Sequence, residues 1–292
     1  GACHENSVQQ TNDGGYIIVG SMIDTLSPLL ISPQLIKTNG NGIEQWSQSI
    51  SNIFFYDGLW KNSVQQTSDG GYIVTGTSWD PNIGLAKIKL IKTDDNGIEQ
   101  WSQNFGEFGF EYLAVLSQQT TDGGYIIAGN TTETDTSVFF EYMSGIGILI
   151  KTDVSGIEQW RQNCEITWIN DIQQTNDGGY IIAGVKVDSV LEIESGILIK
   201  TDGNGVEQWN KTFGAGFPEM TSFNSVQQTT DGGYIAVGTE LAFFAGTVVY
   251  DVFLVKTDSQ GNVTSTFNIP INPNRKLQKI VDILGRETKE KK

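Results

Sequence analysis

The sequence has one histidine, two cysteines and no long apolar run, and each shortage excludes a class of protein. A single histidine, His4, excludes a Ser/His/Asp triad and a histidine metal cluster in the body of the chain. Two cysteines, Cys3 and Cys164, are too few for a four-cysteine zinc site, an iron–sulfur cluster or a disulfide-dense scaffold. No apolar run reaches the roughly 18 residues that a membrane-spanning helix needs.

Basic residues are also scarce, with 18 Lys and Arg against 34 Asp and Glu, a net charge of −16. Such a surface repels phosphate backbones, so the charge argues against nucleic acid as a partner. The charge favours solubility and carries no information about the fold. Glycine, in contrast, is abundant, with 34 residues in 292, and it recurs at regular places.

One sequence unit occurs five times. SVQQTNDGGYIIVG begins at Ser7, and close copies begin near positions 63, 116, 171 and 225. The Asp of the DGG triplet returns at spacings of 56, 53, 55 and 54 residues. A second half, LIKTDxxGIEQW in its common form, follows each copy, and the fifth is decayed. It ends on tryptophan in four copies and on serine in the fifth, at Trp46, Trp101, Trp160, Trp209 and Ser265.

Each copy predicts four short strands. Asp-Gly-Gly and Asp-x-x-Gly supply the positive φ angles that tight hairpins need, between the runs VQQT, YII(V/A)G, LIKT and GIEQW. No part of the repeats shows the apolar period of a helix. Four antiparallel strands in a repeat of about 50 residues are typical of a propeller blade. We therefore expect an all-β protein, a five-bladed β-propeller over residues 1–268, with a weak outer strand in the fifth blade.

The repeated residues are interpreted as scaffold. The tyrosine after DGG begins the second strand, and the tryptophan lies on the outer strand, where a large ring packs against the next blade. The Gln-Gln pair lies on the inner strand, beside the central channel. One glutamine of each pair is expected in a ring of amides in the channel, and the other is expected to be satisfied between blades.

The second half of the repeat and the whole unit each resemble known propeller repeats. The I-K-x-D-x-x-G-x-x-x-W half is similar to the tryptophan-docking repeat of pyrroloquinoline-quinone-type propellers. The whole unit, over residues 7–268, resembles the QQT-DGGYI repeat of secreted bacterial and archaeal propellers. The resemblance implies a propeller and secretion, and it implies no activity. The quinone-binding residues of the first family have no counterpart here, so no cofactor is expected.

The segment 269–292 differs in charge and in motif. Residues 275–292 carry a net charge of +4, which leaves −20 for the rest of the chain. The stretch NPN…KIVDILGRE resembles the opening of the C-terminal sorting domain of the type IX secretion system of Bacteroidetes. That resemblance implies a protein secreted or held at the outer cell surface. Only the first part of that domain is present, so we expect a chain that is cut at both ends.

The two cysteines leave alternatives open. Gly1–Cys3 matches either the end of a lipobox, with Cys3 lipidated, or the loop that enters the first blade, and the loop interpretation is favoured. Cys164 is expected to be a lone buried thiol. A disulfide between Cys3 and Cys164 has no support in the sequence.

The loops that vary among the copies share one face of a propeller, which makes that face the candidate binding surface. These loops join the second strand to the third, and one blade to the next. They are rich in aromatic residues, which suit sugar rings or protein loops, although such residues also fill gaps between blades. The candidate ligand-binding residues are Tyr56, Trp60, Trp79, Phe110, Tyr112, Phe140, Tyr142, Trp168, Phe217 and Phe243.

Catalysis and metal binding are not expected. Five-bladed glycosidases place carboxylates on inner strands, whereas these inner strands repeat neutral Gln-Gln-Thr, and only Asp57, Glu111 and Asp171 lie near the candidate face. The acidic residues of Asp94–Asn96 and Asp202–Asn204 are explained by turn chemistry rather than calcium.

The sequence therefore predicts a monomeric, secreted or cell-surface binding module that is not an enzyme. Its partner would be a polysaccharide or a cell-surface protein. Two alternatives stay open: a glycan-processing enzyme of propeller fold, and a passive structural scaffold.

Overall fold

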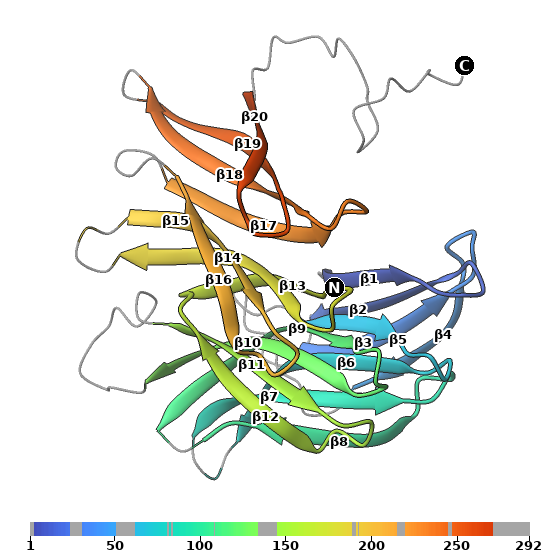
Figure 1. Ribbon diagram of the computed structural model, residues 1–292. Helices are drawn as coiled ribbons and strands as arrows, with labels where there is room; N and C mark the ends of the chain where they lie inside the picture. The colour runs from blue at the N-terminus through green and yellow to red at the C-terminus, as the bar shows by residue number, and fades with distance from the viewer. Residues whose placement is uncertain are drawn as a thin grey trace, which may run out of the picture.

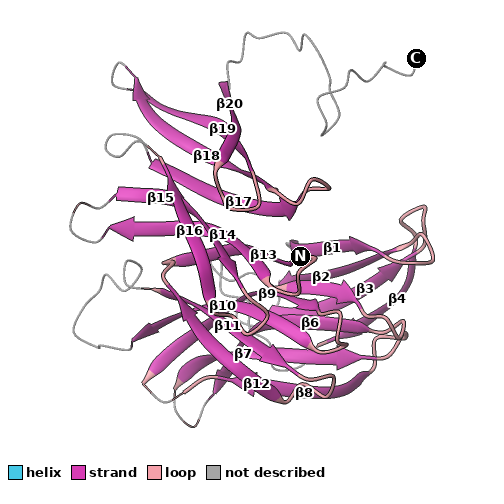
Figure 2. Ribbon diagram, viewed as in Figure 1, coloured by secondary structure: helices cyan, strands magenta, loops and turns pink. Residues whose placement is uncertain are grey.

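The computed structural model consists of twenty strands in five sheets, and no helix occurs in the described residues (Figures 1 and 2). It describes residues 3–23, 31–50, 62–80, 82, 84–107, 109–133, 145–188, 191, 193–214, 220–244 and 247–270. Within these ranges no helix is long and apolar enough to cross a membrane.

Each sheet is a meander of four antiparallel strands, because the order of the strands in space follows their order in the chain. This confirms the expected five-bladed β-propeller with four strands per blade. The strands are, in blade 1, β1 (Cys3–Gln10), β2 (Tyr16–Ile23), β3 (Ile31–Thr38) and β4 (Glu44–Ser49); in blade 2, β5 (Ser63–Gln66), β6 (Tyr72–Asp80), β7 (Leu85–Thr93) and β8 (Glu99–Phe105); in blade 3, β9 (Phe110–Gln119), β10 (Tyr125–Glu133), β11 (Ile146–Thr152) and β12 (Glu158–Cys164); in blade 4, β13 (Trp168–Gln174), β14 (Tyr180–Asp188), β15 (Ile193–Thr201) and β16 (Glu207–Phe213); in blade 5, β17 (Met220–Gln228), β18 (Tyr234–Phe244), β19 (Thr247–Thr257) and β20 (Val263–Pro270).

The outer strand of blade 5 is complete, so the expectation of a weak strand there was wrong. β20 pairs with β19 from Asp251 to Thr257. Strand pairing uses backbone groups, so Ser265 in the place of tryptophan removes a packing contact but no ladder hydrogen bond.

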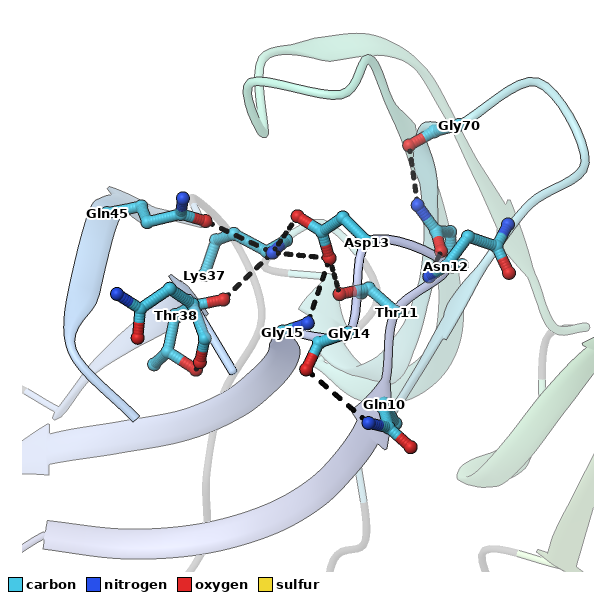
Figure 3. A network of polar contacts seen from close by, with 12 residues as sticks. Gln10, Thr11, Asn12, Asp13, Gly14, Gly15, Lys37, Thr38, Gln45 and Gly70 are labelled. Atoms are coloured by element: carbon cyan, nitrogen blue, oxygen red, sulfur yellow. Dashed lines mark hydrogen bonds and ion pairs between the residues drawn. The ribbon is translucent and has the colours of Figure 1, made fainter. Parts of the chain in front are cut away.

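A lysine, buried in blades 1 to 4 and partly buried in blade 5, holds the two hairpins of each blade together. In blade 1, the Lys37 ammonium lies 2.8 Å from Asp13 Oδ2 and also donates to Thr38 O and Gln45 Oε1 (Figure 3). Asp13 in turn accepts the N–H of Gly15. A Cβ on Gly15 would overlap Thr38 O, which explains the second glycine of DGG. We call this lysine–aspartate pair the latch. The other blades form it with Lys92–Asp69, Lys151–Asp122, Lys200–Asp177 and Lys256–Asp231.

The tryptophan of each of the first four blades packs on the tyrosine of the following blade, as the repeat predicted. Trp46 meets Tyr72 edge-on, with ring centroids 5.8 Å apart. Gly97 of the following blade has a φ of +77°, and a Cβ there would lie 2.6 Å from the Trp46 ring. Burial raises the pKa of Tyr72 to about 12. We call the contact between two consecutive blades a joint. The same pair of rings meets at the next three joints, in the pairs Trp101–Tyr125, Trp160–Tyr180 and Trp209–Tyr234.

Both glutamines of the inner strand bridge neighbouring blades. Gln9 Oε1 accepts the N–H of Gln66 in the next blade, at 2.6 Å. Gln66 Oε1 reaches back and accepts the N–H of Asn12, at 2.8 Å. The expected division, with one glutamine in the channel and one between blades, is therefore incomplete, because the first glutamine also serves the joint. Both bonds recur at the next three joints.

Candidate functional site

The two faces of the propeller differ in sequence variation: the five copies of the repeat are nearly identical on one face and differ on the other. The hairpin face carries the DGG and D-x-x-G turns, whose carboxylates are spent on the latch and on backbone N–H groups. The variable face carries the loops between the second and third strands and the links between blades. Because its loops differ from copy to copy, the variable face is where a specific site is expected.

On the variable face a cavity of about 450 Å³ lies between blades 3 and 4. Its floor is the link from β12 to β13, which makes a tight turn: the N–H of Ile166 donates to Cys164 O at 2.8 Å, which leaves Glu165 at the apex. Thr167 fixes the link to blade 4, because its hydroxyl accepts the N–H of Val187 at 2.9 Å. The lining consists of Gly145, Ile146, residues 163–167, Lys186 and Val187.

The polar groups of this cavity are accessible and carry both signs of charge. Lys186 Nζ lies 3.6 Å from Glu165 Oε2, and both side chains are exposed. A solvated pair at this distance is weak, so either group is free to meet a ligand. Cys164 lies at the bottom, and its pKa is raised to about 12 by burial and by the charge of Glu207. The thiol is therefore neutral at pH 7 and is not a nucleophile.

Trp168 is the sequence-predicted site residue that the structure places beside this cavity. Its side chain is half-buried at the start of β13. A Cβ built on the lining residue Gly145 would lie 3.3 Å from the Trp168 ring, so the indole lies next to Gly145, beside the residues that line the cavity.

Two other candidates pack inward. Tyr112 is 4% exposed and belongs to the core between blades 2 and 3, where burial raises its pKa. Phe110 is half-buried and packs against the same core. Trp79 and Phe243 lie on β6 and β18, and their side chains are outside the described part. The remaining candidates lie outside the described residues: Tyr56, Trp60, Phe140, Tyr142 and Phe217.

Of the carboxylates singled out from the sequence, Asp57 lies outside the described residues, and Asp171 and Asp94 have structural partners. Asp171 joins blades 4 and 5, because its Oδ2 accepts from Ser225 Oγ at 2.7 Å and from the N–H of Val226 at 2.9 Å. Asp94 accepts the N–H groups of Asn96 and Ile98, as expected for a turn. In the part of the chain that is described, no three His, Cys, Asp or Glu side chains gather as a metal site requires.

The polar residues of the cavity were not predicted from the sequence. Asn163 and Lys186 lie near the ends of β12 and β14, and Glu165 and Thr167 lie in the link between blades 3 and 4. The usable signal was the shortness of the link between blades 3 and 4, residues 165–167, which brings the polar residues close to both sheets.

Solved structures share this architecture. No protein-family model matched the sequence, and no curated protein matched it. The structure is similar to the GH93 alpha-L-arabinofuranosidase of Fusarium graminearum in complex with arabinobiose, with a TM-score of 0.54, 8% identity, and coverage of 91% of this chain and 81% of that chain. It also matches an endo-arabinase from Bacteroides thetaiotaomicron (TM-score 0.49, 10% identity, 92% and 94% coverage) and a protein of unknown function from Bacteroides caccae (TM-score 0.44, 12% identity, 81% and 90% coverage).

The prediction that the protein is not an enzyme is corrected by this comparison. A glycoside hydrolase is built on the same fold, and an identity of 8% shows the fold alone. Neutral inner strands therefore do not decide against catalysis. The physical reason is that carboxylates also reach the variable face from the links between blades, as Glu165 does.

Proposed function

We propose that the protein is a carbohydrate-active propeller that takes a glycan into the cavity between blades 3 and 4. The observation that carries this proposal is a cavity of about 450 Å³ with an indole beside its lining and accessible groups of both charges. Ligand pockets typically span about 300–1,000 Å³ and combine apolar surface with a few polar groups.

The chemistry of the lining suits a sugar. The apolar face of a pyranose or furanose ring packs on apolar surface, which Ile146 and Val187 offer in the lining, and the Trp168 indole supports that wall from behind Gly145. Hydroxyl groups donate and accept, and they find partners of both kinds in the Asn163 amide, the Glu165 carboxylate and the Lys186 ammonium.

Glu165 is the residue to test for glycan processing. Glycosidases use two carboxylates, one of which donates a proton to the leaving oxygen. Glu165 lines the cavity at the apex of a turn, where a bound glycan can reach it. Because the similar arabinofuranosidase is described with arabinobiose, arabinose-containing glycans are the first substrates to try.

The test measures binding and product release together. The full chain is titrated with arabinan, xylan and galactan fragments by calorimetry, and reducing ends are counted after incubation. Trp168→Ala is expected to weaken binding at least tenfold. Tyr250→Ala, which removes an exposed aromatic ring of β19, is the matched control and should bind like the wild type.

Glu165→Gln separates the two activities. If the protein processes glycans, this variant binds and releases no product; if it only binds them, no variant changes product release. The proposal is abandoned if no fragment binds and none is cleaved, or if Trp168→Ala binds as the wild type does.

We further propose that the protein works outside the cell, at the surface or secreted. The resemblances of the repeat and of residues 269–292 support this location, and fractionation of the producing cells tests it. The aromatic residues of the variable face beyond the cavity remain a prediction, and Trp60→Ala and Trp79→Ala test whether longer glycans need them.

A further inference from the structure

A cavity beside the inner strands of blades 1 to 4, which we call the channel cavity, is lined by amide groups with a fixed orientation. The inner strands β1, β5, β9 and β13 surround it. In each of these four blades, the first glutamine of the Gln-Gln pair uses its carbonyl oxygen at a joint: it accepts a backbone N–H of the next blade at 2.6–3.0 Å.

This bond decides which way each amide points. A backbone N–H needs an acceptor, and within a glutamine amide only Oε1 accepts. This hydrogen bond therefore sets the orientation of the amide groups of Gln9, Gln65, Gln118 and Gln173. Their Nε2 groups point away from the bond. They make no hydrogen bond with any described residue.

The second glutamine of each pair behaves differently. Gln66 Oε1 accepts the N–H of Asn12, and Gln66 Nε2 donates to Gly70 O at 3.2 Å. Both halves of this amide are used, as they are for Gln119 and Gln174. Unused donors therefore come from the first glutamine alone, which makes the second glutamine a natural control.

The first glutamines of blades 1 to 3, which carry these donors, line the channel cavity, whose volume is about 200 Å³. Its polar lining is Gln9, Gln65, Gln118 and Ser117, and the rest is aliphatic. None of the described residues that line it is charged, so no carboxylate among them competes for the amide N–H groups despite the net charge of −16. A ring of N–H donors over an aliphatic wall has the same logic as backbone nests, which bind anions.

We propose that this channel cavity binds a small free carboxylate ion. The carboxylate oxygens accept from the Nε2 groups of Gln9, Gln65 and Gln118, and the carbon chain lies on the aliphatic lining. This site lies beside the inner strands and does not depend on the glycan cavity between blades 3 and 4.

The test uses acetate as the probe and acetamide, its neutral isostere, as the comparison, at pH 7 and constant ionic strength. In ¹⁵N-labelled wild type, the side-chain amide signals of the three lining glutamines are expected to shift and saturate with acetate at millimolar concentration. Acetamide should leave them in place. This measurement needs no variant, so it decides the proposal even if a variant does not fold.

The matched variant is Gln65→Glu with Gln118→Glu. Each change keeps an oxygen that accepts the backbone N–H at the joint, so the blades still pack. It replaces the amide donor by a second, negatively charged oxygen, so the cavity should repel a carboxylate. Acetate affinity should fall at least tenfold. Gln66→Glu, which alters a side chain outside the cavity, should bind acetate like the wild type. The proposal is overturned if acetate does not saturate the wild-type shifts, if acetamide binds as well, or if the double variant keeps its affinity.

Discussion

Four joints between blades repeat one set of contacts, and the seam between blade 5 and blade 1 has none of them in the described part of the chain. At a joint, a tryptophan meets a tyrosine, and two glutamines bridge the inner strands. At the seam, Ser265 stands in place of the tryptophan. A Cβ on Gly42, the counterpart of Gly97, would meet no atom of the described residues within 4 Å.

Burial differs in the same way. Val8 in blade 1 is 64% exposed, whereas Val64 at the same position of blade 2 is 5% exposed. On the other side of the seam, Val237 is 37% exposed and its counterpart Val19 is fully buried. The residue type is the same in each comparison, so the neighbouring blade and not the local sequence sets the burial.

The comparison separates what a blade holds by itself from what it gains from its neighbours. The latch of blade 1 is as complete as the others, with Lys37 5% exposed. The apolar faces, in contrast, are covered only where another blade packs on them. We therefore expect a substitution inside a blade to lower the free energy of unfolding by the same amount in every blade. The loss from a substitution on a blade face should depend on whether another blade packs on that face.

The largest effect is expected from Val64→Asp set against Val8→Asp. A charge at position 64 would be buried between blades 1 and 2. It should reduce the free energy of unfolding by about 4 kcal/mol or more, whereas an exposed substitution costs within about 0.5 kcal/mol. Urea unfolding of both variants measures the difference. Equal losses would mean that the seam is covered in solution.

Next in size is the removal of a latch lysine. Lys92→Met and Lys37→Met leave Thr93 O and Thr38 O without their buried donor. Each should lower the free energy of unfolding by about 2 kcal/mol. The two losses should agree although one blade faces the seam, and thermal unfolding compares them. A much smaller loss for Lys37→Met would show that the latch stabilises blade 1 less than it stabilises blade 2.

The glycines that face a tryptophan allow a cleaner comparison. Gly97 and Gly42 have φ angles of +77° and +78°, so replacement by alanine costs the same backbone strain in both. Gly97→Ala also collides with the Trp46 ring, which should add about 1–3 kcal/mol to the loss of stability. The difference between the two melting temperatures measures the contribution of the packed tryptophan. Equal melting temperatures would show that the tryptophan does not stabilise the joint.

The smallest effect is expected from acid. Burial alone would raise the pKa of Asp122, but hydrogen bonds from Thr120, Lys151 and Gly124 outweigh it and hold the pKa at about 2. An unfolded aspartate titrates near about 3.9, so this stabilisation is present above pH 4 and is lost as the pH falls toward 2. Asp122→Asn should therefore flatten the fall of the melting temperature between pH 4 and 2.

Asp13→Asn extends the acid comparison to the blade beside the seam. The pKa of Asp13 is also lowered, chiefly by its hydrogen bond from Lys37. Asp13→Asn should also flatten the fall of the melting temperature between pH 4 and 2, as Asp122→Asn does. The opposite direction in either variant would contradict the assignment of the latch as a source of acid sensitivity.

The fold was predictable because the information is repeated five times in local signals. DGG marks a hairpin, and the apolar runs YII and LIK mark strands that are buried on both faces. Ile73 and Leu90, one from each kind of run, are fully buried. The latch was missed because Lys37 stands within an apolar run, where spacing alone does not show that a buried ammonium meets an aspartate 24 residues earlier.

The candidate site was predictable only as a face. Trp168 was found because it is a large aromatic residue in a variable link. Glu165 and Lys186 were not, because each appears once and neither belongs to a repeated pattern. The cavity forms where a link, a strand start and a strand end from two blades converge, and single-sequence periodicity carries no information about such convergence.

The Gln-Gln pair and the tryptophan have a consequence for how such a chain changes over generations. Every full copy carries a donor half and an acceptor half of the same joint, so a gene segment of about one repeat length can be duplicated or deleted in frame, and the copies that become neighbours still fit. A copy that loses its tryptophan, as the one with Ser265 has, no longer fits any successor, and it limits where the array can grow.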